Sequence, residues 1–295
     1  MALEDRIRET FEPIRTQVGV RAIKGTALRK RRLRRASGGV VVVALAATVS
    51  IVSPGLVPGR GSRSAAASTL LELAAIVRAE PMITVGPNQY LYSKTQARRE
   101  ACGGLLDGDE CRWERLVREL WTAPDGSGRS AGQDSFSSWS EIVGPGEMGG
   151  SLTQGVPPTD VDELREFIRE RASHADQPLD YEMFVVVSDL LRETFSSPVL
   201  YSTPNLRSSL FEVAATLPGV EDLGLTTDQV GRTGVGIGYT HGDQRLELIF
   251  DSETAAILGT REVRLMGPGE EPKIIPGSWA VYLEVGVVDS VRDRP

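Results

Sequence analysis

The sequence is short of the residues from which catalytic and metal sites are usually built. It has two histidines, His174 and His241, and two cysteines, Cys102 and Cys111. A catalytic triad or a zinc site would have to draw on these few side chains. The G-x-S-x-G, H-E-x-x-H and P-loop motifs are absent from the sequence. We therefore expect no catalytic residues, no cofactor and no metal, and we interpret the chain as a non-enzyme.

Long apolar stretches are also scarce. Hydrophobic residues make up 40% of the chain, which is far too low for a protein that crosses the membrane many times. The one long stretch without charge runs from Gly38 to Val57. Twenty helical residues span about 30 Å, the thickness of the hydrocarbon core. This segment therefore predicts a single transmembrane helix.

Charge is distributed unevenly along the chain. Residues 1–36 hold eleven Arg or Lys against four acids, while the rest holds 22 basic and 36 acidic residues. By the positive-inside rule, this places the N-terminus in the cytoplasm, and anionic lipid explains the basic cluster better than nucleic acid does. The cluster consists of Arg29, Lys30, Arg31, Arg32, Arg34 and Arg35.

This reading gives four segments. Residues 1–37 form a basic cytoplasmic segment, 38–57 the transmembrane helix, 58–67 a linker and 68–295 an extracytoplasmic domain, so the protein resides in the cytoplasmic membrane. An apolar stripe over residues 3–18 is suited to a cytoplasmic regulatory protein or to the lipid surface. The alternative is a cleaved signal peptide, with Ala65, Ala66 and Ala67 as the cleavage site.

Both cysteines follow the membrane segment, in a compartment that permits disulfides. They bracket a short loop, residues 103–110, that a bond between Cys102 and Cys111 would close. We favour this disulfide over two reduced thiols.

Periodicity predicts an α+β fold for the outer domain. Helices are expected from Ser68 to before Pro81, from Asp160 with a capping box at Glu163, over 181–195 and over 203–217. Strands are expected over 89–95, 235–240, 245–250, 257–265 and 279–288, and residues 141–158 read as loop. Residues 113–121 fit a helix and a hairpin equally well. The predicted fold class is one transmembrane helix followed by a curved antiparallel sheet packed with helices.

Several weak motifs carry no site. Gly236 and Gly238 precede His241 where a dinucleotide motif needs a third glycine, so we predict a glycine-containing strand. The acids of residues 107–110 lack the spacing of a calcium loop and read as a solvated turn. Ser93 and Lys94 are adjacent on a predicted strand and would point to opposite faces, which argues against a dyad.

A set of segments in a fixed order resembles a known family. They are the basic stretch before the apolar helix, residues 89–92, Trp121 with residues 124–129, residues 188–194, 217–220 and 248–251, and Leu258 with Gly259. Together they resemble actinobacterial single-pass membrane proteins of uncharacterised function, often encoded beside extracytoplasmic-function sigma factors. The resemblance implies a strand at Trp121, an outer domain similar to lipoprotein-carrier-like folds, and a part in sigma-factor regulation. Residues 1–36 lack the His and Cys of a zinc-binding anti-sigma domain.

The leading functional hypothesis is a membrane-anchored module that binds or senses a lipid, a peptide or an envelope protein. The first alternative is an envelope lipid or lipoprotein carrier, which needs an apolar cavity under the sheet. The second is an envelope hydrolase, which needs a cleft that gathers a histidine with a nucleophile and an acid.

Overall fold

The computed structural model describes residues 64–81, 83–102, 111–148, 156–172, 177–266 and 273–295. Every described residue belongs to one compact unit, Gly59–Pro295, which we call the second unit because residues 1–58 precede it. The predicted membrane segment 38–57 and the basic cluster lie outside the described residues. Within the described ranges, no helix is both long and apolar enough to cross a membrane.

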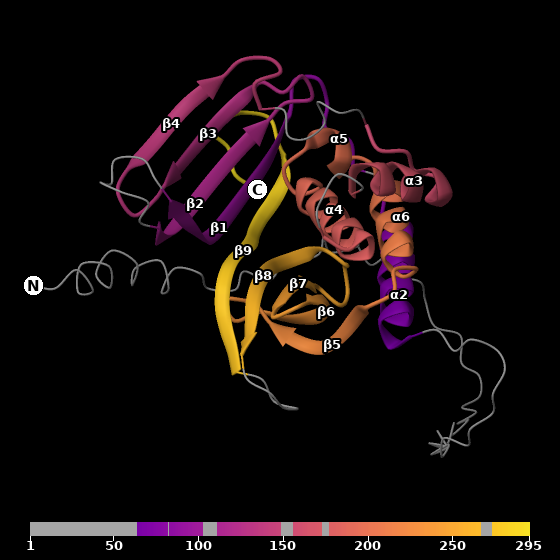
Figure 1. Cartoon of the computed structure of the whole chain (residues 1–295). Coiled ribbons are helices and arrows are strands. Elements are labelled where there is room, and N and C mark those ends of the chain that lie inside the picture. The colour runs from indigo at the N-terminus through magenta and orange to yellow at the C-terminus, as the bar shows by residue number, and fades with distance from the viewer. Residues whose placement is uncertain (1–63, 82, 103–110, 149–155, 173–176, 267–272) are drawn as a thin grey trace, which may run out of the picture. The chain divides into compact units, whose positions relative to one another are not determined.

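A single antiparallel sheet dominates the second unit (Figure 1). It has nine strands in the order β4-β3-β2-β1-β9-β8-β7-β6-β5. The strands are β1 Tyr90–Cys102, β2 Cys111–Thr122, β3 Gly128–Gln133, β4 Ser138–Val143, β5 Val220–Thr227, β6 Thr233–His241, β7 Gln244–Phe250, β8 Ile257–Met266 and β9 Lys273–Val288.

The long strand β9 joins two halves of this sheet. Its first part pairs with β8 up to Val281, and its second part pairs with β1 from Trp279 onward. The two neighbours therefore overlap along only a short stretch of β9. Bulges in the β1–β9 and β8–β9 pairings lie next to this overlap, and bulges bend a strand and increase its twist.

In the described ranges, five helices accompany the sheet. Their starts follow local rules: the Ser64 side chain accepts a hydrogen bond from the Ala67 amide, and the Asp160 side chain accepts from the Asp162 and Glu163 amides. Prolines occupy the first turn of the last two helices. The helices are α2 Ala65–Ala79, α3 Val161–Ala172, α4 Leu179–Glu193, α5 Pro198–Tyr201 and α6 Pro204–Ala214.

The main core lies between the helices and one half of the sheet. It joins the buried faces of α2, α3, α4 and α6 to strands β6–β9. Phe211 of α6 meets Phe250 of β7 edge-on, with ring centroids 5.1 Å apart. On β9, Tyr282 also belongs to this core. We call the sheet face that carries Tyr282 the inner face, and the opposite face the outer face.

The outer face of the other half has a small core of its own. Tyr92 and Trp121 are opposite each other on β1 and β2, with ring centroids 5.1 Å apart, and neither side chain is exposed. Residues 289–295, which we call the strap, fold back over them. The Trp121 Nε1 donates a hydrogen bond of 2.7 Å to the Asp293 carbonyl, and Val291 packs on the same cluster.

The predicted fold class is wrong. We predicted a transmembrane helix followed by an α+β domain in which helices pack on a curved sheet. The described part of the chain is instead a domain dominated by one nine-stranded sheet, with few helices and no membrane-spanning one. The prediction gave too little weight to strands because three of them, β3, β4 and β5, have polar or glycine-rich sequences.

Individual elements were predicted with mixed success. Helices α2, α3, α4 and α6 and strands β6 to β9 lie where periodicity placed them, apart from their ends. Residues 113–121 belong to strand β2, as the resemblance implied, so the helical reading of that segment is wrong. The predicted loop 141–158 begins inside strand β4.

Candidate functional site

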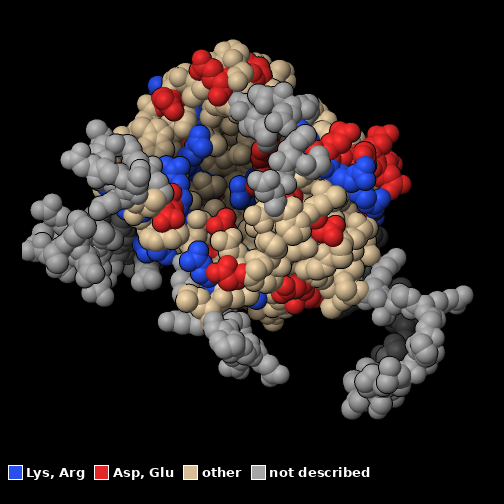
Figure 2. Space-filling view, in the orientation of Figure 1, with Lys and Arg blue, Asp and Glu red and all other residues tan. Residues whose placement is uncertain are grey.

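The helices leave part of the inner face without a covering layer. The main core, as far as the structure describes it, contains no residue of strands β1 to β4. Figure 2 shows the surface hollowed between this half of the sheet and the helices, with basic side chains gathered along the hollow. We call the inner face of β1–β4, together with the end of β9, the open half.

Strand register identifies the side chains of the open half. Thr95 of β1 is paired with Arg118 of β2 on one side and with Tyr282 of β9 on the other. Directly paired residues point to the same face, so Arg118 lies on the inner face with Tyr282. Leu116 and Leu120 are two residues away on β2 and therefore share that face. Both leucines are only partly buried.

An indole ring lies beside Arg118. Gly132 of β3 is paired with Arg118 and with Trp139 of β4. A Cβ atom built on Gly132 would come within 2.5 Å of the Trp139 ring, so glycine is required for the ring to lie flat over this position. The Trp139 Nε1 donates a weak hydrogen bond of 3.4 Å to the Ser130 hydroxyl.

The guanidinium of Arg118 is exposed to solvent and yet surrounded by protein. Desolvation by the surroundings lowers the pKa of Arg118, with the charge of Arg99 adding to this and Glu141 opposing it. Exposure together with desolvation is typical of a group in a concave surface. In the described part of the chain, the Arg118 side chain forms no hydrogen bond and no ion pair.

The basic side chains near Arg118 have acidic partners. Arg99 forms an ion pair of 2.6 Å with Glu114 on the inner face. On the outer face, Lys94 pairs with Glu284 at 3.5 Å. Among these basic groups, Arg118 is therefore the one with unused donors, in a neighbourhood of leucine and tryptophan.

Tyr282 marks the border between the open half and the helix-covered half. Its ring meets Phe195 edge-on at a centroid distance of 4.7 Å, just beyond the end of α4. Burial raises the pKa of Tyr282 to about 12, so its phenol is neutral at physiological pH. The buried, uncharged ring of Tyr282 thus borders the open half.

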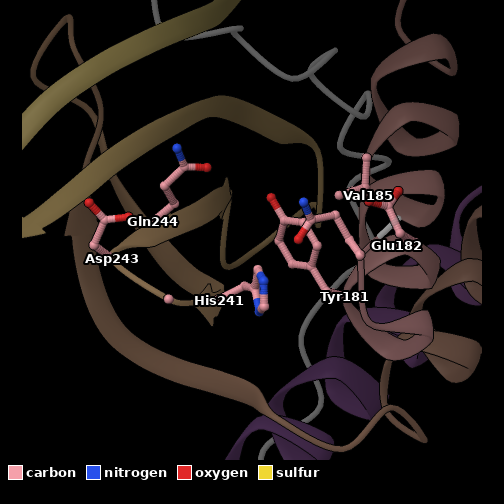
Figure 3. A pocket seen from close by; sticks show the side chains of 8 residues that line it. Tyr181, Glu182, Val185, His241, Asp243 and Gln244 are labelled. Carbon is pink, nitrogen blue, oxygen red and sulfur yellow. The ribbon is translucent and has the colours of Figure 1, made fainter. Parts of the chain in front are cut away.

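A separate pocket lies at the other end of α4, beside the β6–β7 hairpin (Figure 3). Its volume is about 470 Å³. In Figure 3, the rings of Tyr181 and His241 lie next to each other, and their centroids are 5.2 Å apart. The hairpin contributes Asp243 and Gln244, and α4 contributes Glu182 and Val185.

The residues singled out in the sequence do not gather into one site. His241 is the last residue of β6 and lines this pocket, whereas His174 and the acids of 107–110 lie outside the described residues. Ser93 is buried, and Lys94 is directed to the other face. Gly236 and Gly238 belong to strand β6, which pairs on both sides, so the predicted glycine-containing strand is confirmed.

The two cysteines lie at the end of the β1–β2 hairpin. Cys111 begins β2 and is disulfide-bonded, and the strand register places Cys102 directly opposite. The chain has no other cysteine. The Cys102–Cys111 disulfide stays a prediction.

The sequence contained a signal for Arg118 that the prediction did not use. Once residues 113–121 are assigned to a strand, Leu116, Arg118 and Leu120 alternate on one face. An arginine between two leucines on one strand face is a candidate binding residue. The signal was hidden because the same segment also fits helical spacing.

Comparison with known proteins adds no family assignment. No protein-family model matches the chain, and no curated protein matches it.

Proposed function

We propose that the domain is a binding module without turnover, whose ligand is an amphiphilic anion held on the open half. The observation that carries this proposal is Arg118, a solvent-accessible guanidinium that forms no ion pair with any described residue and lies between Leu116 and Leu120 on its strand face. The proposal narrows the ligand of the predicted binding or sensing protein to one chemical class.

The guanidinium of Arg118 is the reason that we expect an anionic group in the ligand. Arginine presents donors in a planar fork that matches a carboxylate or a phosphate. Glu141 lies near enough to affect the pKa of Arg118 but forms no ion pair with it. A ligand anion would therefore take a position that no described carboxylate occupies.

The apolar side chains around Arg118 are the reason that we expect an apolar part in the ligand. Leu116, Leu120 and Trp139 are each partly buried and partly open to water. Covering apolar surface yields about 25 cal/mol per Å², so an alkyl chain laid over these residues adds to the binding of its head group. A small inorganic anion lacks this contribution.

The membrane layout links this binding to signalling. We propose that the domain stands outside the membrane, that the segment 38–57 anchors it, and that binding is reported to a cytoplasmic regulatory protein linked to a sigma factor. The support is the charge distribution of the sequence and the resemblance described above. A lipid close to the membrane is an amphiphilic anion that such a sensor would encounter.

The carrier alternative requires a cavity large enough to enclose a lipid. Under the helix-covered half, the space is filled by the main core, which includes Phe184, Phe211 and Phe250. The hollow over the open half is accessible to such a ligand, whereas the pocket beside the β6–β7 hairpin is lined mainly by polar side chains. This favours a ligand that lies on the sheet over one that is enclosed beneath helices.

A titration of the full-length protein with palmitate tests the proposal. The corresponding alcohol, 1-hexadecanol, serves as the neutral counterpart. We expect saturable binding of palmitate and at least about tenfold weaker binding of the alcohol, because a hydrogen bond to a charged group contributes about 1.5–3 kcal/mol. The Arg118→Gln variant should bind palmitate about as weakly as wild type binds the alcohol.

A matched control separates the site from general electrostatics. Arg292 lies in the strap over the outer face and is exposed, so Arg292→Gln removes the same charge elsewhere. The control should bind palmitate like wild type. Equal binding of acid and alcohol, or equal losses in both variants, would refute the assignment of Arg118.

A further inference from the structure

We infer that the pocket between α4 and the β6–β7 hairpin is a second binding site, for the ammonium group of an alkylammonium compound. This site is independent of the amphiphile site, because it has its own residues at the opposite end of α4. Its volume of about 470 Å³ lies within the range of small-molecule pockets.

Aromatic rings form one side of this pocket. The Tyr181 ring lies 5.2 Å from His241 and 5.6 Å from Tyr239, and Phe184 supports Tyr239 from behind at 5.6 Å. Tyr181 and His241 are both partly exposed in the pocket. A ring face attracts a cation through its quadrupole, and adjacent rings strengthen this attraction.

Three carboxylates, of Asp180, Glu182 and Glu262, lie near these rings. Glu182 lines the pocket, and the pKa of Tyr181 is raised mainly by burial and further by the charge of Glu262 nearby. Asp180 acts in the same way on Tyr239. Within the described ranges, none of these three acids forms an ion pair.

The basic groups nearby do not cancel this charge. Arg264 pairs with Asp243 at the pocket rim, at 3.4 Å, and is thereby engaged. The pocket thus combines ring faces with excess negative charge, which disfavours an anion and leaves a neutral ligand without its strongest partners. An ammonium group satisfies both features at once.

Two sources supply such a group: a lysine side chain of a peptide, and a quaternary ammonium of the choline type. We would titrate the full-length protein with Nα-acetyl-lysine-methylamide and with tetramethylammonium, following the tyrosine ring signals by NMR. tert-Butanol has a shape close to that of tetramethylammonium but carries no charge, so it serves as the neutral control. We expect saturable shifts at Tyr181 and Tyr239 with at least one cation, at an affinity about tenfold or more above that of tert-butanol.

Variants assign the effect to the pocket. Glu182→Gln and Tyr181→Leu should each weaken the binding of the better cation about fivefold. Glu253→Gln, in the exposed turn after β7, removes one carboxylate away from the pocket and should leave affinity unchanged. Glu182 is a partly exposed helix residue, so its variant keeps the test valid if Tyr181→Leu unfolds.

The cation that binds more tightly indicates whether the natural ammonium group comes from a lysine side chain or from a quaternary ammonium compound. Equal affinity for tert-butanol and both cations, shifts that do not saturate, or an unchanged affinity in Glu182→Gln would overturn the inference. None of these outcomes bears on palmitate binding, so the two proposals fail or stand separately.

Discussion

Glu247 is a carboxylate with no exposed surface, held between two arginines. Its Oε1 lies 2.6 Å from a nitrogen of Arg245 on the same strand, and its Oε2 accepts from Arg261 on β8. Both guanidinium groups are mostly buried. The three side chains form one unit, in which the loss of the central charge leaves two cations close together.

We predict that Glu247→Gln lowers the free energy of unfolding by about 3–4 kcal/mol. Urea unfolding followed by tryptophan fluorescence measures this change. Glu253→Gln, which replaces an exposed acid in the turn after β7, should change the free energy of unfolding by less than about 0.5 kcal/mol. A similarly small effect of Glu247→Gln would show that the ion cluster does not stabilise the sheet.

At the scale of elements, the strap depends on one carboxylate. Glu119 accepts hydrogen bonds of 2.8 and 2.9 Å from Arg294 and one of 2.6 Å from the Tyr92 hydroxyl. The hydrogen bond from Arg294 is the main cause that lowers the pKa of Glu119 below its usual value, aided by Tyr92 and opposed by desolvation. The folded state therefore favours the charged form.

This shift fixes the sign of a pH effect. A carboxyl whose pKa is lower in the folded state contributes stability above its unfolded pKa of about 4.5, and this stability is lost as the pH falls through the folded value. We predict that Arg294→Gln costs about 1 kcal/mol at pH 7, since Arg294 is half exposed. The cost should shrink toward pH 3 in urea titrations. A cost independent of pH would contradict this account of the strap.

The β1–β2 hairpin is expected to be closed by the Cys102–Cys111 disulfide. In non-reducing conditions neither cysteine should react with iodoacetamide, and iodoacetamide added after reduction should add two carbamidomethyl groups to the intact mass. A ring of this size contributes about 2–3 kcal/mol in the chain-entropy description, so reduction should lower the unfolding free energy by that amount. Alkylation of both cysteines in the unreduced native protein would exclude the bond.

The sequence predicts some elements well and others poorly, for physical reasons. Strand β7 places Leu246, Leu248 and Phe250 in the main core under the helices, and this two-residue spacing is visible in the sequence. Strand β5, at an edge of the sheet, reads VEDLGLTT, and its exposed Leu225 and its bulge hide the alternation. Local patterns cannot show that β9 stands between β8 and β1, since that pairing joins segments far apart in the chain.

The candidate site was less predictable than the fold elements. Arg118, Gly132 and Trp139 come together only through strand register, and their spacing along the chain carries no motif. Tyr181 and His241 likewise meet through the packing of α4 on β6. Residue types rare in the sequence, the cysteines and histidines, were flagged instead because their chemistry is recognisable without structure.

At the scale of the whole molecule, the single-pass layout is a prediction about residues 1–63 relative to the domain. Added protease should digest the domain in intact cells while residues 1–37 remain protected and membrane-bound. The physical reason is the eleven basic residues before the apolar segment, which oppose translocation. A shortened chain released from the cells would instead indicate a cleaved signal peptide and end the transmembrane signalling proposal.

The central claim is that an amphiphilic anion lies on the open half of the inner face. Crosslinking of the full-length protein with a photoreactive fatty acid, followed by peptide mass mapping, tests it most directly. We predict adducts on the inner-face residues of β1 and β2, Ala97, Leu116 and Leu120, and their loss in Arg118→Gln. Adducts concentrated on outer-face residues such as Trp113, or on the helices alone, would contradict the claim.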